Sequence, residues 1–222
     1  GLKQLDVQLV ARAEAGNRSS LNLQALIEGN RVGRLSVSGN TTVVTQSGLP
    51  IVSEQERVQL DVNLNVTDLG WISAIVGDET ELGGRIEASA RFTRVNGVWN
   101  ATGTITGDDL RIVRVDDGIR LINGTLRGRF TDTQVVIDSL RFPSVIRSTP
   151  RNSQVRAWIR QYGDQGSVEA TGSWSLETAE GSAEVRLSRF PVVQRADRFI
   201  AGSGEIRIEV TPRRMSITGK LQ

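Results

Sequence analysis

The chain contains neither cysteine nor histidine. Without cysteine there is no disulfide, thiolate metal site or cysteine nucleophile, and without histidine the commonest general base and metal ligand is missing. Aromatic residues make up only 5% of the 222 residues, which is few for filling a wide core. The sequence also has no run of about 18 apolar residues, so it predicts no membrane-spanning helix. Because it enters a strand pattern directly after Gly1, we expect a segment of a longer protein, with targeting signals elsewhere.

The chain also has no large excess of charge of either sign. The chain has 27 Lys and Arg against 25 Asp and Glu, a formal net charge of +2. The sequence pI of about 9.6 is high because few groups titrate between the carboxylates and the strong bases. A charge of +2 does not indicate a nucleic-acid partner, and none is expected.

Catalytic motifs are missing as well. The paired carboxylates Asp108-Asp109 and Asp116-Asp117 are adjacent in strands or turns, where neighbouring side chains point to opposite faces and form no acid/base dyad. Both pairs lie beside glycine or at strand ends, where aspartate serves as a turn residue. No Walker-type loop or dinucleotide fingerprint is present. The sequence therefore predicts a protein that is not an enzyme and holds no cofactor or metal.

The feature that is abundant is strict alternation of apolar and polar residues. In 58–66 every even position is apolar and every odd position polar, which is the pattern of a β-strand with two unlike faces. About a dozen such segments follow one another with short connections, so we expect an all-β fold with a long antiparallel meander. The parity places these residues on the apolar face: Val58, Leu60, Val62, Leu64, Ile86, Ala88, Ala90, Phe92, Trp99, Ala101, Ile105, Leu126, Val168, Ala170, Trp174, Val185, Leu187, Ile206, Ile208, Val210 and Ile217.

Turns and irregularities punctuate the meander. Asn96-Gly97 predicts a tight β-hairpin, and Asp116-Asp117-Gly118 predicts a second turn. The apolar parity changes between Ile137 and Leu140, which predicts a β-bulge there.

A short helix is predicted at 68–77. Asp68 can accept hydrogen bonds from its first turn and Gly77 can end it, while Leu69, Ile72 and Val76 share one stripe. This helix is either a plug for the apolar face or a cover for the edge of the sheet, and both roles need the same packed stripe.

The stretch 152–163 has two readings. Val155, Trp158, Ile159 and Tyr162 fall at the i, i+3, i+4 and i+7 spacing of an amphipathic helix. Every second residue from Val155 to Ile159 is also apolar, so a strand remains open.

Arginines cluster around the same stretch, and no acid interrupts 139–163. One interpretation is a docking site for lipid phosphates or an acidic partner, and the other is a solvated loop and helix face. The arginines concerned are Arg147, Arg151, Arg156 and Arg160.

Several motifs in this order resemble the C-terminal region of the TamB family, the translocation and assembly module subunit that belongs with the AsmA-like bridge proteins. The resemblance runs from about Leu60 to the end, and the first 55 or so residues match only as generic amphipathic strands. The motifs are Leu82-Gly83-Gly84 with its preceding helix, Gly103–Leu110, Asp117-Gly118, Asn123–Leu126, Ser139–Phe142 and Gly166–Leu176. The Arg-rich stretch near 143–165 is longer than the simplest form of the module.

The resemblance implies a β-taco, a long antiparallel sheet curled into an open groove lined with apolar side chains. Its parts are N-terminal strands at 1–67, the short helix at 68–77, and a TamB-like module at 78–222. It further implies a periplasmic location in a Gram-negative bacterium, with a tether to the inner membrane outside this chain. The implied partners are a TamA-like outer-membrane barrel, phospholipid and unfolded outer-membrane protein strands, and the implied role is guidance of acyl chains or protein clients toward the outer membrane.

The sequence leaves open alternatives for the role of the apolar face and for the function of the chain. Most apolar strand faces close on each other as dry core, and alternation does not distinguish a closed core from a groove. The chain is alternatively a docking module whose edge strand, such as 215–221, pairs with a partner barrel. A carbohydrate-binding domain needs exposed aromatic platforms, whereas Trp99 and Trp174 fall on the apolar parity.

Overall fold

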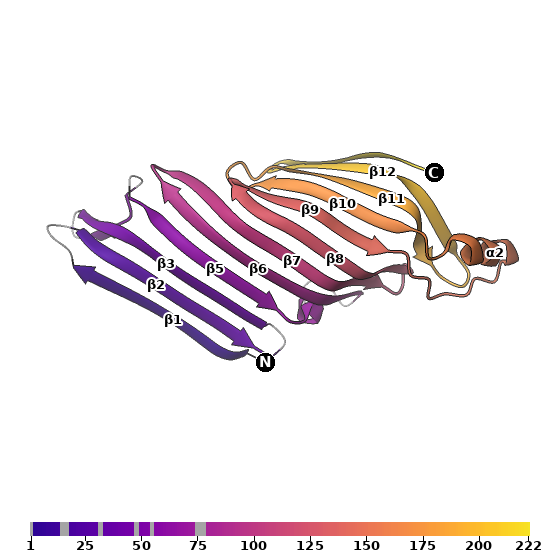
Figure 1. Ribbon diagram of the computed structural model, residues 1–222, viewed down its shortest axis with the longest axis horizontal. Helices are drawn as coiled ribbons and strands as arrows, with labels where there is room; N and C mark the ends of the chain where they lie inside the picture. Colours follow the sequence, from indigo (N-terminus) through magenta and orange to yellow (C-terminus); the bar gives the residue numbers. More distant parts are fainter. Residues whose placement is uncertain (1, 14–17, 31–32, 47–48, 54–55, 74–78) are drawn as a thin grey trace.

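The computed structural model describes residues 2–13, 18–30, 33–46, 49–53, 56–73 and 79–222. Nearly all of them belong to one antiparallel sheet of 13 strands (Figure 1). The strands are β1 (Leu2–Ala13), β2 (Arg18–Gly29), β3 (Gly33–Gln46), β4 (Leu49–Ile51), β5 (Val58–Val66), β6 (Thr80–Val95), β7 (Val98–Arg114), β8 (Ile119–Asp132), β9 (Gln134–Pro143), β10 (Ser167–Ser175), β11 (Gly181–Gln194), β12 (Phe199–Thr211) and β13 (Arg214–Leu221).

The sheet is a meander that stays open. From β5 to β13 each strand pairs with the next one in sequence, as do β1, β2 and β3, and β3 pairs with β5. The short β4 pairs only with β3. Among the described strands, β1 pairs only with β2, and β13 only with β12, so the two ends of the sheet do not join. In Figure 1 the strands follow one another along the longest axis, from β1 at one end toward α2 (Ser153–Tyr162) at the other. The predicted fold class, an all-β antiparallel meander, is confirmed.

The register brings apolar residues onto one face of the sheet. Leu64 on β5 lies opposite Ala88 on β6, which lies opposite Ile105 on β7. Further along, Ala183 on β11 lies opposite Ile208 on β12. Because directly opposed residues of an antiparallel pair project to the same face, apolar rows run across the strands and the polar residues between them occupy the other face.

The predicted turns and bulge are present. Asn96 and Gly97 have φ values of 52° and 80°, the positive values that a two-residue type I′ hairpin requires. Gly118, at φ 71°, donates its N–H to Val115 O at 3.1 Å and closes the second turn. The register of β9 shifts at Asp138 against both β8 and β10, so the parity change in the sequence marks a real bulge.

Two helical segments lie between strands in the described part of the chain. Within 68–73, the described part of the predicted helix, the structure has a 3-10 turn, η1 (Leu69–Ile72), which Asp68 caps by accepting a hydrogen bond from Gly70 N at 2.8 Å. Gly77 and Val76, which we placed in the same helix, lie outside the described residues. The stretch 152–163 forms α2, capped by the Asn152 side chain, so its helical reading is confirmed. Among the described residues no helix has the length and apolarity needed to cross a membrane.

Core packing concentrates at one end of the strands, where η1 lies. Leu110, Leu126 and Phe142 form a buried cluster, with exposed fractions of 7%, 9% and 3%. Leu69 of η1 packs against this cluster together with half-buried side chains from neighbouring strands. The apolar face is therefore filled by the protein's own side chains at this end.

Candidate functional site

A cavity of about 440 Å³ lies on the apolar face at the opposite end of the strands. Its walls come from strands far apart in the sheet, because Leu60 and Val62 belong to β5 whereas Leu176 follows β10. Four strands separate β5 from β10 in the sheet order. The sheet therefore curls around its apolar face, and the cavity is the hollow of that curl. Its lining residues are Leu60, Val62, Phe92, Gly97, Val98, Trp99, Thr133, Leu176 and Glu177.

Small residues on β7 lie next to an aromatic pair that borders the hollow. Phe92, which lines the hollow, meets Phe130 edge to face with ring centroids 5.9 Å apart. Ala101, opposite Phe92 on β7, is only 1% exposed. Two residues further, a Cβ at Gly103 would lie 2.1 Å from Ser89 O and its φ is 153°, so no side chain fits there. At these two positions β7 therefore carries no large side chain between the strands that hold the two rings.

Trp99 lines the hollow and is 39% exposed. Trp174, on β10 two positions before the lining residue Leu176, is 40% exposed. The Arg94 guanidinium lies 5.7 Å from the centre of the Trp99 ring, a cation–π contact, and its Nη2 donates to Ser53 O at 3.1 Å. Arg94 was not among the predicted site residues, although it continues the apolar parity of β6 by two positions after Phe92.

The predicted lining residues are mostly half-buried, as expected for a sheet face without a second layer. Of this set, Ala90, Ala101 and Leu126 are buried, and Trp99, Trp174 and Ile217 are exposed. The half-buried members are Val58, Leu60, Val62, Leu64, Ile86, Ala88, Phe92, Ile105, Val168, Ala170, Val185, Leu187, Ile206, Ile208 and Val210. Only Leu60, Val62, Phe92 and Trp99 of the whole set line the 440 Å³ hollow.

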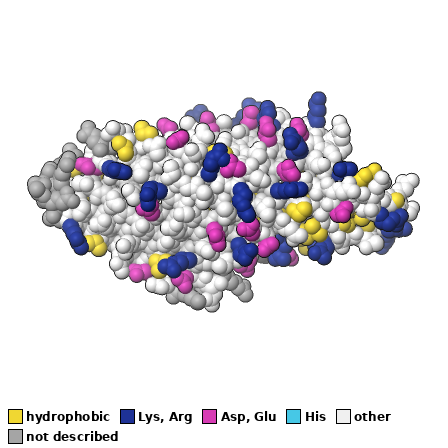
Figure 2. All heavy atoms as spheres, viewed as in Figure 1, with side chains coloured by type: hydrophobic (Ala, Val, Ile, Leu, Met, Phe, Trp, Pro, Cys, Tyr) yellow, Lys and Arg dark blue, Asp and Glu magenta, His cyan; other side chains and the backbone are white. Residues whose placement is uncertain are grey.

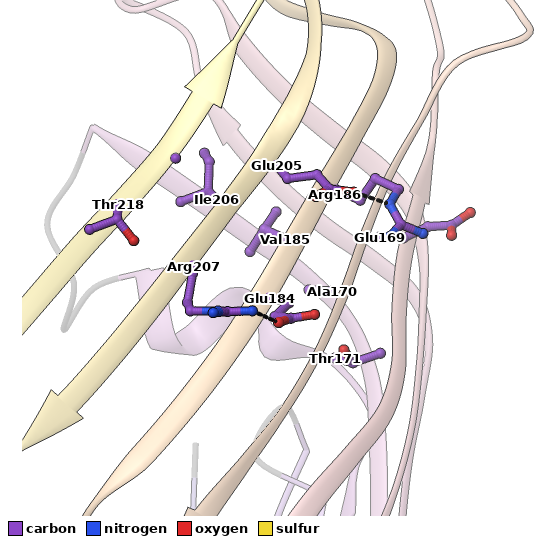
Figure 3. Close-up of a pocket in the computed structure, with 11 residues that line it drawn as sticks. Glu169, Ala170, Thr171, Glu184, Val185, Arg186, Glu205, Ile206, Arg207 and Thr218 are labelled. Carbon is purple, nitrogen blue, oxygen red and sulfur yellow. Dashed lines mark hydrogen bonds and ion pairs between the residues drawn. The ribbon is translucent and has the colours of Figure 1, made fainter.

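The polar face is covered by ion pairs that join adjacent strands. Arg186 on β11 donates to Glu205 on β12 at 3.0 Å (Figure 3). In a second pair the arginine is on β12 and the acid on β11, because Arg207 pairs with Glu184. Figure 2 shows basic and acidic side chains mixed over the sheet in this way. Cross-strand pairs of opposite charge favour this register and leave the face solvated.

The same pattern holds on the N-terminal half of the polar face. Arg91 on β6 donates to Asp61 on β5 at 2.6 Å, and this hydrogen bond lowers the pKa of the Asp61 carboxyl below its ordinary value. The carboxylate pair Asp108-Asp109 is also divided between two arginines, Arg127 and Arg85. The two aspartates therefore act as separate surface ion pairs.

The Arg-rich stretch forms a cap at the filled end of the sheet. The buried Gln194 side chain (4% exposed) accepts from Arg147 N at 3.1 Å and donates to Val145 O at 3.1 Å. The backbone N–H of Gln194 donates to Gly118 O at 2.8 Å. One glutamine thus ties the cap, β11 and the β7–β8 turn together, and sequence reasoning did not single it out. We call residues 144–166 the cap.

The α2 helix anchors the cap through aromatic contacts. Trp158 packs against Phe199 of β12 with ring centroids 5.9 Å apart, and the Arg189 guanidinium lies 5.3 Å from the centre of the Tyr162 ring. Of the predicted contact arginines, Arg147, Arg151 and Arg160 are exposed. Arg156 instead donates to Pro150 O at 3.0 Å and holds the loop that precedes the helix.

A comparison with protein families matches residues 156–222 to the TamB C-terminal domain. The match starts inside α2 and continues through β10 to β13, covering 67 of the 222 residues. It supports a TamB-family assignment. No curated protein and no solved structure gives a significant match to the chain. The matched residues include most of α2 and the strands β10 to β13. Most residues that line the hollow precede the matched range in sequence, and only Leu176 and Glu177 lie within it.

Proposed function

We propose that this chain is a periplasmic segment of a TamB-like envelope protein whose curled sheet holds acyl chains in its apolar groove. The observation that carries the proposal is the 440 Å³ hollow, which is walled by apolar side chains from opposite arms of the curl. Its volume lies in the range of ligand pockets. In this proposal the chain catalyses no reaction.

Retention in such a groove needs no specific polar contact. Burial of apolar surface stabilises a bound chain by about 25 cal/mol per Å², or about 0.8 kcal/mol per methylene group. The open mouth and the continuous apolar rows allow an acyl chain to shift sideways from one strand to the next. The match of residues 156–222 to the TamB C-terminal domain supports an envelope protein. In this proposal the protein is tethered outside this chain to the inner membrane and works with a TamA-like barrel. Unfolded outer-membrane protein strands are a second cargo that the same apolar surface fits.

A photo-crosslinking amino acid at Val62 is expected to capture lipid in cells, whereas the same group at Asp61 is not. Val62 lines the hollow, and its neighbour Asp61 projects to the polar face, where it pairs with Arg91. Lipid adducts are detected by mass spectrometry of the purified protein. Equal capture at both positions contradicts a groove that holds acyl chains, and adducts made only of protein identify a polypeptide cargo.

A second candidate function is docking through the last strand. On β13, Met215, Ile217 and Leu221 are 64%, 60% and 66% exposed, and within the described residues β13 pairs only with β12. An edge strand with free backbone groups and exposed apolar side chains is a template for strand addition. The partner that fits is an open strand edge of a TamA-like barrel.

Proline at Ser216 or Thr218 is expected to weaken binding to the barrel partner, because proline removes a backbone donor and is poorly tolerated in a paired strand. A proline scan over 214–221 covers both the N–H groups that face outward and those that face β12. Affinity for the purified partner is measured by surface plasmon resonance, and unchanged melting temperature confirms that each variant is folded. If every variant binds like the unaltered chain, docking does not occur by addition to β13.

A further inference from the structure

The exposed arginines of the cap form no ion pair with an acid of the described residues. On the polar face Arg85, Arg141 and Arg186 each form an ion pair with an acid of another strand, although other arginines of the sheet have none within the described residues. In the cap, Arg147 and Arg160 are exposed, and no ion pair joins either of them to an acid of the described residues. The cap therefore gathers unpaired positive charge in one short stretch of the chain, where an external anion can reach it.

The backbone that carries these arginines is held in place. Arg147 N is bonded to the buried Gln194, and Arg151 N donates to Ala196 O at 3.2 Å. Arg160 lies in the last turn of α2, which Asn152 caps at its start and Trp158 fixes against β12. The exposed guanidinium groups therefore project from a fixed scaffold, and little backbone order has to be gained on binding.

Two further features narrow the kind of anion. The cap occupies one extreme of the long axis of the molecule (Figure 1), so it can meet a flat surface end on. Exposed apolar side chains lie beside the strands that support it, with Val192 36% and Ile200 49% exposed. Basic and hydrophobic side chains adjoin at this end in Figure 2. Basic groups interleaved with apolar ones are typical of surfaces that bind an anionic bilayer.

We propose that the cap is a docking surface for a bilayer containing anionic phospholipid, which it contacts through Arg147, Arg151 and Arg160. The cap contains four arginines and a single acid, Asp164, so its formal charge is positive. Asp197 is paired with Arg195 at 3.1 Å, and Asp164, which lies beside Arg160 in a shallow hollow, forms no ion pair with it in the described part of the chain. This surface is separate from the acyl-chain groove and does not depend on it.

The test uses the full 222-residue chain and sedimented vesicles of two compositions. One is made of equal parts phosphatidylglycerol and phosphatidylcholine, and the other of phosphatidylcholine alone. We expect binding only to the first, falling as salt is raised because ions screen exposed charges. Each arginine near an anionic surface contributes about a fivefold gain in binding. Arg147→Gln, Arg151→Gln and Arg160→Gln together should therefore weaken binding by on the order of a hundredfold, and each alone by about fivefold.

The matched control is the triple variant Arg85→Gln, Arg141→Gln and Arg186→Gln. It removes the same three charges and, like the cap variant, takes the net charge from +2 to −1. We expect it to bind like the unaltered chain. An equal loss in both triple variants attributes binding to net charge and overturns the proposal, as does a cap variant that binds normally. Binding to neither vesicle also overturns it and leaves an acidic protein surface as the partner. The Val62 crosslink is unaffected by any of these outcomes.

Discussion

Replacement of Phe142 by alanine is expected to lower the free energy of unfolding by about 3–5 kcal/mol. Phe142 is 3% exposed and forms the buried cluster with Leu110 and Leu126. Its ring also lies where a Cβ of Gly124 would be, with Phe142 Cε1 at 2.2 Å from that position, so position 124 of β8 supplies no side chain that could fill the space. The loss therefore combines the transfer of a large apolar side chain with the cavity that it leaves.

Urea denaturation followed by circular dichroism measures this effect. The control is Ile217→Ala on β13, where the side chain is 60% exposed and truncation is expected to change stability by no more than about 0.5 kcal/mol. A Phe142→Ala variant as stable as this control would show that the cluster does not hold the curled sheet together.

Replacement of Gln194 by leucine is expected to cost on the order of 1–3 kcal/mol, because it leaves two partly buried backbone groups, Arg147 N and Val145 O, without their partners. The damage should be concentrated in the cap, since both lost bonds join Gln194 to it. Hydrogen exchange of the Arg147 amide and of the α2 amides should accelerate, while exchange in β5 and β6 stays slow.

Gln165→Leu is the matched control for this variant. Gln165 is exposed, and its side chain makes one bond, from Nε2 to Gln161 O at 3.1 Å. We expect its substitution to change stability by about 0.5 kcal/mol at most. Uniform acceleration of exchange through the whole sheet in the Gln194 variant would mean that the cap is not a separate unit.

The strands were predictable because their periodicity is local. Alternation from Val58 to Val66 needs no knowledge of the partner strand, and the register then follows from keeping one face apolar. The same logic located the bulge at Asp138 from a change of parity, and the hairpin at Asn96-Gly97 from residues that tolerate positive φ.

The curl and the cap were not predictable, because both depend on contacts between residues distant in sequence. No local pattern shows that Leu176 shares a hollow with Leu60. Gln194 reads as an ordinary polar residue at the end of β11, and only its burial beside Val145 and Gly118 gives it a role. The cap arginines were visible in the sequence, but only the structure shows that Arg147, Arg151 and Arg160 are exposed and form no ion pair with an acid of the described residues.

The length of the apolar rows depends on the number of strands in the sheet. A row such as that from Leu64 on β5 to Ile217 on β13 advances along the hydrogen-bond direction, by about 4.8 Å per strand. Adding one hairpin therefore lengthens the path by roughly 10 Å without changing its chemistry, because the new strands need only repeat the alternation. The length of such a sheet can therefore change by gain or loss of whole hairpins while its apolar rows stay continuous.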